Sequence, residues 1–453
     1  MEKKPNSKKK IYVFTLLINI LMLVALKYTN FILTNITAVG SRFSDNIHEG
    51  DWSVKWIASL GISFYALQMI GYLTDCYWGI TAPQKNIGKL ALYNIYFPQM
   101  VSGPINKYSN LSSSLFAEHK FDANNLREGG FRILQGFFKK LVVSEQLTGI
   151  VDYLYANYAE YNGIYVWIGT ALYLLQLYSD FSGCMDIVLG ASKCFGIDLA
   201  ENFKAPFAST SVQEFWQRFH MSLGAWLKDY IMYPLMRSSA FSKMTKKLKN
   251  KYGKKAAKMI PTFAAMFVVW FCMGLWHGGG WNFIGEGIWF WLMIVLGQLL
   301  EKPLKSLGKN LHINGESKFM HSLKCVGTSF LIGIGILFFK AVSLRAAFTM
   351  IGSAFNLSRL IASVGTVGES LSLLDSSIGT NRIVWAAISV AIGLAVMILF
   401  GLKDKAEERF HVYISKKNFW IRLLVGYLLI MSIIFLGAYG PGYSASEFIY
   451  GGF

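Results

Sequence analysis

The segment 259-MIPTFAAMFVVWFCMGLWHGGGWNFIG-285 contains no Asp, Glu, Lys or Arg. A helix needs roughly 20 mostly apolar residues to cross the hydrocarbon core of a bilayer. Because lipid offers no hydrogen-bond partners, the backbone of such a run must satisfy its own N–H and C=O groups, as it does in a helix. The segment therefore predicts a membrane-spanning helix.

Four further runs lack these charged residues, namely 56–74, 161–179, 383–402 and 423–446. The chain is 53% hydrophobic and only 15% charged, whereas soluble proteins have about 25% charged residues. A transmembrane β-barrel would show alternating segments of about ten residues, and the sequence has no such alternation. These features predict an all-α polytopic membrane protein.

Basic residues lie between the apolar runs and produce the net charge of +18. No nucleic-acid-binding motif accompanies them, so nucleic acid is not an expected partner. Cytoplasmic loops of membrane proteins are rich in Lys and Arg, which places 237–258, 301–324 and 403–419 in the cytoplasm. The spans that alternate between these loops are 259–276, 283–300, 325–343, 383–402 and 420–438.

The N-terminus, residues 1–10, is basic and precedes an apolar run from Ile11 to about Ile36. This run is too long for a signal peptide, and no small-residue cleavage site follows it. We predict an uncleaved first span with a cytoplasmic N-terminus. The acidic stretch 41–52 then forms an external loop, and the protein lies in the cytoplasmic membrane.

Two segments differ from simple spans. Segment 90–105 is short and contains two prolines, which predicts a re-entrant or buried element. Segment 211–236 mixes aromatic and charged residues and predicts an amphipathic helix, either at the membrane face or packed inside the bundle. Without internal repeats, the chain is expected to be a single domain over 1–453, with a core over 61–283 and a C-terminal tail over 440–453.

Several classes of function lack their motifs. The five cysteines form no CxxC pair and are expected to be buried apolar side chains rather than zinc ligands or disulfides. The sequence contains no Walker A, GxGxxG, HExxH or GxSxG motif. We therefore expect no bound cofactor and no metal site.

His277 stands near the end of the charge-free segment, between Trp276 and a run of glycines. An imidazole titrates near neutral pH and can take a proton from a hydroxyl. A polar group in a membrane is costly, which favours a functional role. The alternative is a histidine that only packs within a helix bundle.

Other polar residues interrupt apolar surroundings. Arg218 and His220 can bind an anionic group at the interface, or Arg218 can extend its charge to the headgroups while His220 packs. Segment 176-QLYSDFSGCMD-186 contains Gln176, Ser179 and Asp180. These three either line a water-filled cavity or cap helices at a break.

Five stretches together resemble the membrane-bound O-acyltransferase superfamily, and within it the bacterial alginate O-acetylation branch. They occur in the family order and span residues 61–283. The stretches are 61-GISFYALQMIGYLTDCYWG-79, 97-FPQMVSGPI-105, 176-QLYSDFSGCMDIVLGASKCFGIDLAENFKAPF-207, 213-QEFWQRFHMSLGAWLKDYIMYPL-235 and 274-GLWHGGGWNF-283.

The resemblance implies a ring of roughly 9–11 transmembrane and re-entrant helices around a central tunnel. It places the family's signature histidine on His277 and the second histidine of this branch on His220. The implied reaction is O-acyl transfer, with acetyl as the expected group, from acetyl-CoA or another cytoplasmic thioester to an envelope polysaccharide or peptidoglycan. The implied partners are that polymer or an extracellular acetyltransferase.

The sequence departs from the family pattern in three places. It begins later than most members, which have two or three hydrophobic segments before the position of Ile11. Glu286 stands where the family often has an aromatic residue. The tail 447-EFIYGGF-453 resembles the family's C-terminal signature but has glycines in its later positions.

As a mechanism, the resemblance suggests His277 as general base, with Trp276, Asn282 or a backbone N–H of Gly278–Gly280 stabilising the oxyanion. His220 and Arg218 are candidates for binding donor phosphates or for a second proton transfer. Asp180 is a candidate for lining the polar cavity. Two alternatives remain open: D-alanyl transfer to teichoic acid from a carrier protein, and a transporter of acyl groups or glycans.

Overall fold

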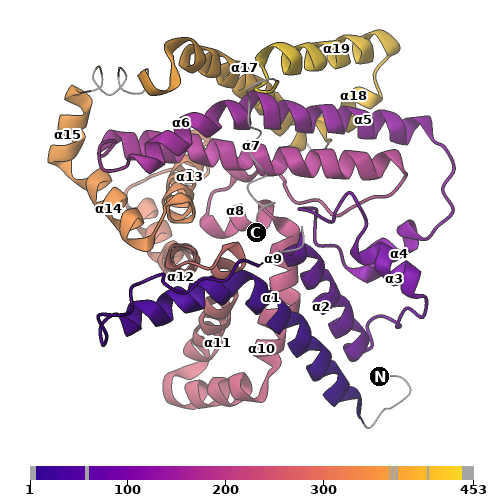
Figure 1. Cartoon of the computed structure of the whole chain (residues 1–453), viewed down its shortest axis with the longest axis vertical. Coiled ribbons are helices and arrows are strands. Elements are labelled where there is room, and N and C mark those ends of the chain that lie inside the picture. Colours follow the sequence, from indigo (N-terminus) through magenta and orange to yellow (C-terminus); the bar gives the residue numbers. More distant parts are fainter. Residues whose placement is uncertain are drawn as a thin grey trace. The chain divides into compact units, whose positions relative to one another are not determined.

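The computed structural model describes residues 7–56, 61–366, 368, 372, 376–405 and 408–440. Within them every regular element is a helix, apart from one isolated bridge between Phe203 and Phe219. The all-α prediction is therefore confirmed (Figure 1). The first six residues and the predicted tail beyond Gly440 lie outside the described residues.

Six of the described helices are long and apolar enough to cross a membrane. A seventh span results if α14 (Leu344–Phe355) and α15 (Leu357–Gly365), bent by 79°, are taken together. The chain is thus a multi-pass membrane protein. The six helices are α1 (Lys8–Gly40), α11 (Ser239–His277), α12 (Trp281–Asn310), α13 (Lys318–Lys340), α17 (Thr380–Lys405) and α19 (Phe419–Leu436).

Two predicted runs form helices that fall short of these criteria. Run 56–74 corresponds to α2 (Ile62–Trp78), which is short, and residues 57–60 of the run lie outside the described residues. Run 161–179 corresponds to α7 (Ile164–Cys194), which is long but carries polar side chains within it.

The chain forms two compact units, each assembled from separate stretches of sequence. The first comprises Met1–Glu118 and Ala225–Gly287, with Gly451–Phe453 outside the described residues, and the second comprises His119–Gly224 and Ile288–Tyr450. Because both units are discontinuous in sequence, neither is a simple N- or C-terminal domain. The single domain over 1–453 stays a prediction.

In the first unit, α1 and α2 lie side by side (Figure 1), and Tyr12 stacks on Tyr77 with ring centroids 4.2 Å apart. The predicted buried segment 90–105 contains the end of α3 (Ile87–Asn94) and a series of turns that reach toward α4 (Tyr108–Leu115). Gln99 Oε1 accepts a hydrogen bond from the buried Asn106 at 2.8 Å. Much of this segment is buried, and it does not form a continuous spanning helix.

In the second unit, α5 (Ala123–Phe137) continues through a π-helical turn, η2 (Phe138–Ser144), into α6 (Glu145–Ala156). Helix α5 lies along α7 (Figure 1). The short helix α18 (Phe410–Ser415) packs against α5.

Two basic segments predicted as loops are largely helical. Helix α11 begins at Ser239, where the Ser238 hydroxyl accepts a hydrogen bond from the Phe241 N–H, and it bends at Gly253, whose φ is +81°. Helix α12 runs on to Asn310, and α13 begins at Lys318. Lysine is a good helix former, so the charged ends of these spans remain helical.

Segment 211–236 was predicted as one amphipathic helix, and this prediction is wrong. The segment breaks into α8 (Val212–Arg218), α9 (Met221–Leu227), η4 (Lys228–Met232) and α10 (Tyr233–Arg237). The break between α8 and α9 occurs at His220, whose φ of +51° is left-handed and cannot continue a helix. Phe215 and Trp216 are buried, so this part packs inside its unit.

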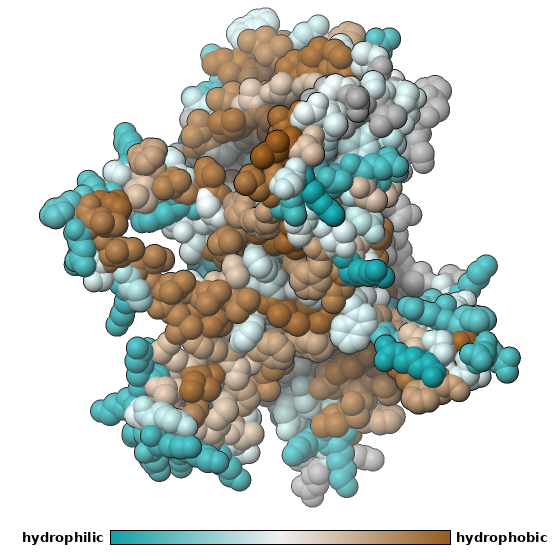
Figure 2. Space-filling model, turned by 90° about the vertical axis from the view of Figure 1, so that its left-hand side faces the viewer, coloured by the Kyte–Doolittle hydropathy of each residue, from teal (hydrophilic) through white to brown (hydrophobic). Residues whose placement is uncertain are grey.

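Hydrophobic side chains are exposed over much of the surface. On the face shown in Figure 2, hydrophobic residues form broad areas, and hydrophilic residues gather at projecting tips. The exposed apolar side chains include Phe14, Leu21 and Trp420, which are 67%, 61% and 73% accessible. Such surface is costly in water and stable in lipid, which agrees with the multi-pass assignment.

Candidate active site

The end of α11 and the first turns of α12, both in the first unit, form a tight hairpin that carries His277. Helix α11 ends at His277, and α12 begins at Trp281 after the glycine run. The two backbones approach closely because Gly274 and Gly287 lack side chains. A Cβ on Gly287 would lie 2.3 Å from the Trp270 carbonyl oxygen, and one on Gly274 would lie 2.3 Å from that of Phe283.

Inside this hairpin the His277 imidazole meets a carboxylate. His277 Nδ1 lies 2.8 Å from Glu286 Oε2, and the two side chains are only 1% and 2% exposed. Glu286 sits in the first turns of α12, on the helix that packs against the end of α11. A buried carboxylate is costly unless it is paired, so this contact accounts for the presence of Glu286.

Sequence reasoning noted Glu286 only as a departure from the family pattern. A clear signal was available, because Glu286 is the only Asp, Glu, Lys or Arg in residues 259–300. A lone ionisable residue inside a membrane segment is by default a functional candidate.

Helix α1 also contacts the hairpin. Lys27 Nζ donates a hydrogen bond to the Trp276 carbonyl and lies 4.9 Å from the centroid of the Trp276 ring. The Tyr28 hydroxyl donates to the Leu275 carbonyl. These carbonyls lie in the last turn of α11, where no intrahelical donors remain. Lys27 interrupts the first apolar run, and its contact explains why a charge is tolerated there.

The predicted oxyanion residues lie in the same hairpin. Trp276 is buried, and its ring meets Phe64 of α2 edge to face with centroids 5.6 Å apart. Asn282 is buried in the first turn of α12, and its Oδ1 lies so close to Gly280 that a Cβ there would be 2.4 Å away. Their role in stabilising an oxyanion stays a prediction.

His220 belongs to the second unit, whereas His277 belongs to the first. It is buried at the break between α8 and α9, with its ring edge-on to Phe181 at 4.8 Å. Asn202 holds this break, because its carbonyl accepts from the Met221 N–H at 3.1 Å and its side chain accepts from the Ser222 N–H at 2.9 Å. The catalytic role of His220 stays a prediction.

Arg218 lies in the last turn of α8 and is about 30% exposed. Its guanidinium pairs with Glu214 at 2.7 Å, and Glu214 also accepts two hydrogen bonds from Thr210. Thr210 and Arg218 hold the pKa of Glu214 below its usual value although partial burial opposes this. The use of Arg218 for donor phosphates stays a prediction.

The residues of 176–186 lie within the unbroken helix α7, so the alternative that they cap helices at a break is wrong. Gln176 donates to the Thr148 hydroxyl at 2.9 Å, and the Ser179 hydroxyl lies 3.6 Å from Met397 Sδ. Asp180 pairs with Lys140 at 2.5 Å. All three residues are buried, and their assignment to a tunnel stays a prediction.

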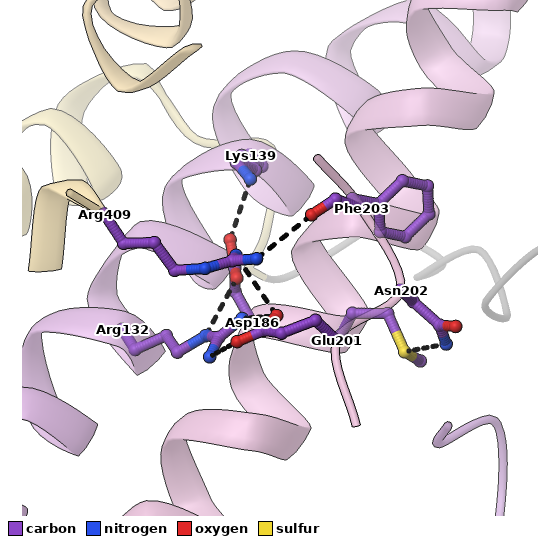
Figure 3. Close-up of polar contacts among 8 residues, drawn as sticks. Arg132, Lys139, Asp186, Glu201, Asn202, Phe203 and Arg409 are labelled. Atoms are coloured by element: carbon purple, nitrogen blue, oxygen red, sulfur yellow. Dashed lines mark hydrogen bonds and ion pairs between the residues drawn. The ribbon is translucent and has the colours of Figure 1, made fainter. Parts of the chain in front are cut away.

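A second buried charge cluster in the same unit was not anticipated (Figure 3). Asp186 pairs with Arg132 at 3.1 Å and with Lys139 at 2.7 Å. Glu201 pairs with Arg132 at 2.6 Å and with Arg409 at 3.1 Å. Each of these cations contacts a carboxylate around a small recess. The compensated charges indicate a structural role.

His411 of α18 lies beside this cluster and is buried. Burial, together with the nearby Arg132 guanidinium, lowers the pKa of His411 to about 3. The side chain is therefore neutral at physiological pH and adds no charge to the cluster.

The ion pairs of Asp180 and Asp186 had a signal in the sequence. Their partners include the adjacent lysines at 139 and 140, which stand inside an apolar stretch.

The hairpin packing leads to a first prediction. Gly287→Ala is expected to cost about 1–3 kcal/mol of stability, because its Cβ must push α12 away from the Trp270 carbonyl. Gly297→Ala is the matched control on the same helix, where a Cβ meets nothing within 4 Å, and it should gain about 0.5–1 kcal/mol. Thermal unfolding in detergent compares them, and equal midpoints would contradict the described packing.

Comparison with known proteins adds a family match. Residues 82–250 match the MBOAT, membrane-bound O-acyltransferase family. The matched range includes His220 and ends before His277.

Individual relatives cover more of the chain. The "Probable alginate O-acetylase AlgI" of Azotobacter vinelandii is 30% identical over 73% of this chain and 60% of its own length. A peptidoglycan O-acetyltransferase of Helicobacter pylori is 26% identical over 99% of this chain and 84% of its own length. A teichoic acid D-alanyltransferase of Bacillus subtilis is 27% identical over 54% of this chain and 60% of its own length. The chain thus spans about 60% of the first of these relatives.

Proposed function

Because the chain belongs to the membrane-bound O-acyltransferase family, we propose that it transfers an acyl group, expected to be acetyl, from a cytoplasmic thioester to hydroxyls of a cell-envelope polymer. The observation that carries the proposal is the buried His277–Glu286 pair at 2.8 Å in a membrane hairpin. An imidazole held by a carboxylate is suited to accept a hydroxyl proton. The names of the relatives, which refer to alginate, peptidoglycan and teichoic acid, support a polymer as the acceptor.

In the proposed reaction His277 takes the proton of the acceptor hydroxyl as its oxygen attacks the thioester carbonyl carbon. The tetrahedral intermediate then breaks its carbon–sulfur bond, and the imidazolium returns the proton to the departing sulfur. The products are an ester and a free thiol, and no redox partner is required. A positioned base contributes about 10²–10⁴-fold to such a reaction.

The other site residues receive roles within this proposal. Asn282, or a backbone N–H of the glycine run, stabilises the oxyanion beside Trp276. His220 and Arg218 bind the donor's phosphates or assist the second proton transfer, and Asp180 lines a polar cavity. The acceptor is a polysaccharide or peptidoglycan, reached directly or through an extracellular acetyltransferase, and the location is the cytoplasmic membrane.

D-alanyl transfer to teichoic acid is a second candidate, favoured by the similarity to the Bacillus subtilis protein. We predict that purified protein in proteoliposomes consumes radiolabelled acetyl-CoA, because the fraction of this chain aligned with the alginate and peptidoglycan relatives is larger. A carrier protein charged with D-[14C]alanine is tested in parallel, with envelope polymer as acceptor. Label transfer only from the carrier protein would favour the second candidate, and transport without ester formation would reject both.

A further inference from the structure

Glu286 is the ionisable residue of the hairpin that the proposed reaction leaves without a role. It is the only Asp, Glu, Lys or Arg in residues 259–300, and its side chain is 2% exposed. An isolated carboxylate at such a position is strongly destabilising. Its contact with His277 Nδ1 at 2.8 Å supplies the compensating partner.

The surrounding packing holds this contact in place. Gly274 and Gly287 let the backbones of α11 and α12 approach closely. Both side chains stand on helices and not on loops, which favours a fixed mutual orientation. A histidine whose Nδ1 donates to a carboxylate has Nε2 as its basic nitrogen.

Other ionisable groups near the hairpin act on the backbone. Lys27 and Tyr28 of α1 donate to the carbonyls of Trp276 and Leu275. By contrast, Glu286 contacts the imidazole itself.

We propose that Glu286 is a positioning residue for the transfer reaction: its carboxylate accepts the Nδ1–H of His277, directs Nε2 toward the acceptor hydroxyl and stabilises the imidazolium formed when that proton is taken. The inference rests on the proposed function, in which His277 is the base. In this proposal the transferred proton stays on the imidazole, so no second proton transfer to Glu286 is involved. The buried pair is neutral overall when the imidazole is protonated, which lowers the cost of the charge in the membrane.

Glu286→Gln tests this role, because an amide keeps the shape of the side chain but not its charge. We expect kcat for acyl transfer to fall by about 10²-fold, with KM for donor and acceptor nearly unchanged.

Two further variants test whether this loss is due to the charge. Glu286→Asp keeps the carboxylate and should recover part of the loss. Glu301→Gln makes the same change at an exposed site of α12 and should leave the rate unchanged. Wild-type kcat in Glu286→Gln, or no recovery in Glu286→Asp, would overturn the inference.

A spectroscopic measurement on the wild-type protein decides the same point without variants of Glu286. ¹⁵N-histidine NMR in lipid nanodiscs reports which ring nitrogen carries the proton. The His277 signals are identified among the seven histidines by their loss in His277→Ala. A neutral His277 ring protonated at Nδ1 is expected. A ring protonated at Nε2, with Glu286 donating to Nδ1, would overturn the inference.

The two proposals fail in different ways. If wild-type protein forms no ester from either thioester donor, the proposed acyl transfer fails, whatever the state of the His277 ring. If wild-type protein transfers the acyl group and His277→Ala does not, while Glu286→Gln behaves as wild type, only the role of Glu286 fails.

Discussion

His277→Ala is expected to lower acyl transfer by about 10²–10⁴-fold while the protein still inserts and accumulates in the membrane. The reason is that the alanine variant lacks the only group assigned to take the acceptor proton. Alanine also leaves the Glu286 carboxylate buried without its His277 partner, so some loss of stability accompanies the loss of activity. Ester-linked acetyl in the envelope polymer, measured after alkaline release, provides the readout.

His321→Ala is a suitable control, because this histidine is exposed at the start of α13 and has no assigned role. It should retain wild-type transfer. The amount of each variant in the membrane is measured by immunoblotting. Wild-type acetylation by a normally inserted His277→Ala protein would remove the proposed base and, with it, the proposed mechanism.

Arg132→Met is expected to destabilise the protein by about 3–5 kcal/mol. Arg132 is buried and pairs with both Asp186 and Glu201. Methionine retains much of the side-chain volume but leaves these carboxylates with less cationic charge around them. The cost arises mainly from the carboxylates that stay buried. Methionine is used in place of alanine because the shorter alanine side chain would add a loss of packing to this cost.

Thermal or denaturant unfolding in detergent measures this effect. Lys305→Met removes a cation from an exposed ion pair with Glu301 on α12, and we expect no measurable change, since exposed pairs contribute little. An Arg132→Met variant as stable as Lys305→Met would show that the buried cluster does not support the fold.

The sequence was sufficient for much of the fold because the relevant signals are local. The apolar spans placed between the basic loops predicted α11, α12, α13, α17 and α19, and each is present. The charge-free runs 56–74 and 161–179 instead correspond to α2 and α7, which fall short of the criteria for a span. Their ends were less predictable, since lysine-rich stretches such as the start of α11 remain helical. The break at His220 was missed, because its left-handed backbone depends on hydrogen bonds to Asn202, a residue outside the segment.

The candidate site was likewise only partly predictable from the sequence. His277 was recognisable from its glycine and tryptophan neighbours and from its position in a charge-free run. Asp180 and Asp186 stood out as acids in an apolar region, but their partners Lys140, Lys139 and Arg132 are distant in sequence. A pairing between side chains on different helices leaves no local pattern, so it emerges only when those helices pack.

The amino-acid sequence by itself determined the membrane class, most of the spans and the identity of the candidate base, because apolar length and lone polar residues are properties of a linear chain. Only the tertiary structure decided that Glu286 faces His277. Two glycines let α11 and α12 approach closely enough for a hydrogen bond. The physical reason is that burial in lipid makes each charge costly, and a partner's position in space, not along the chain, determines how that cost is offset.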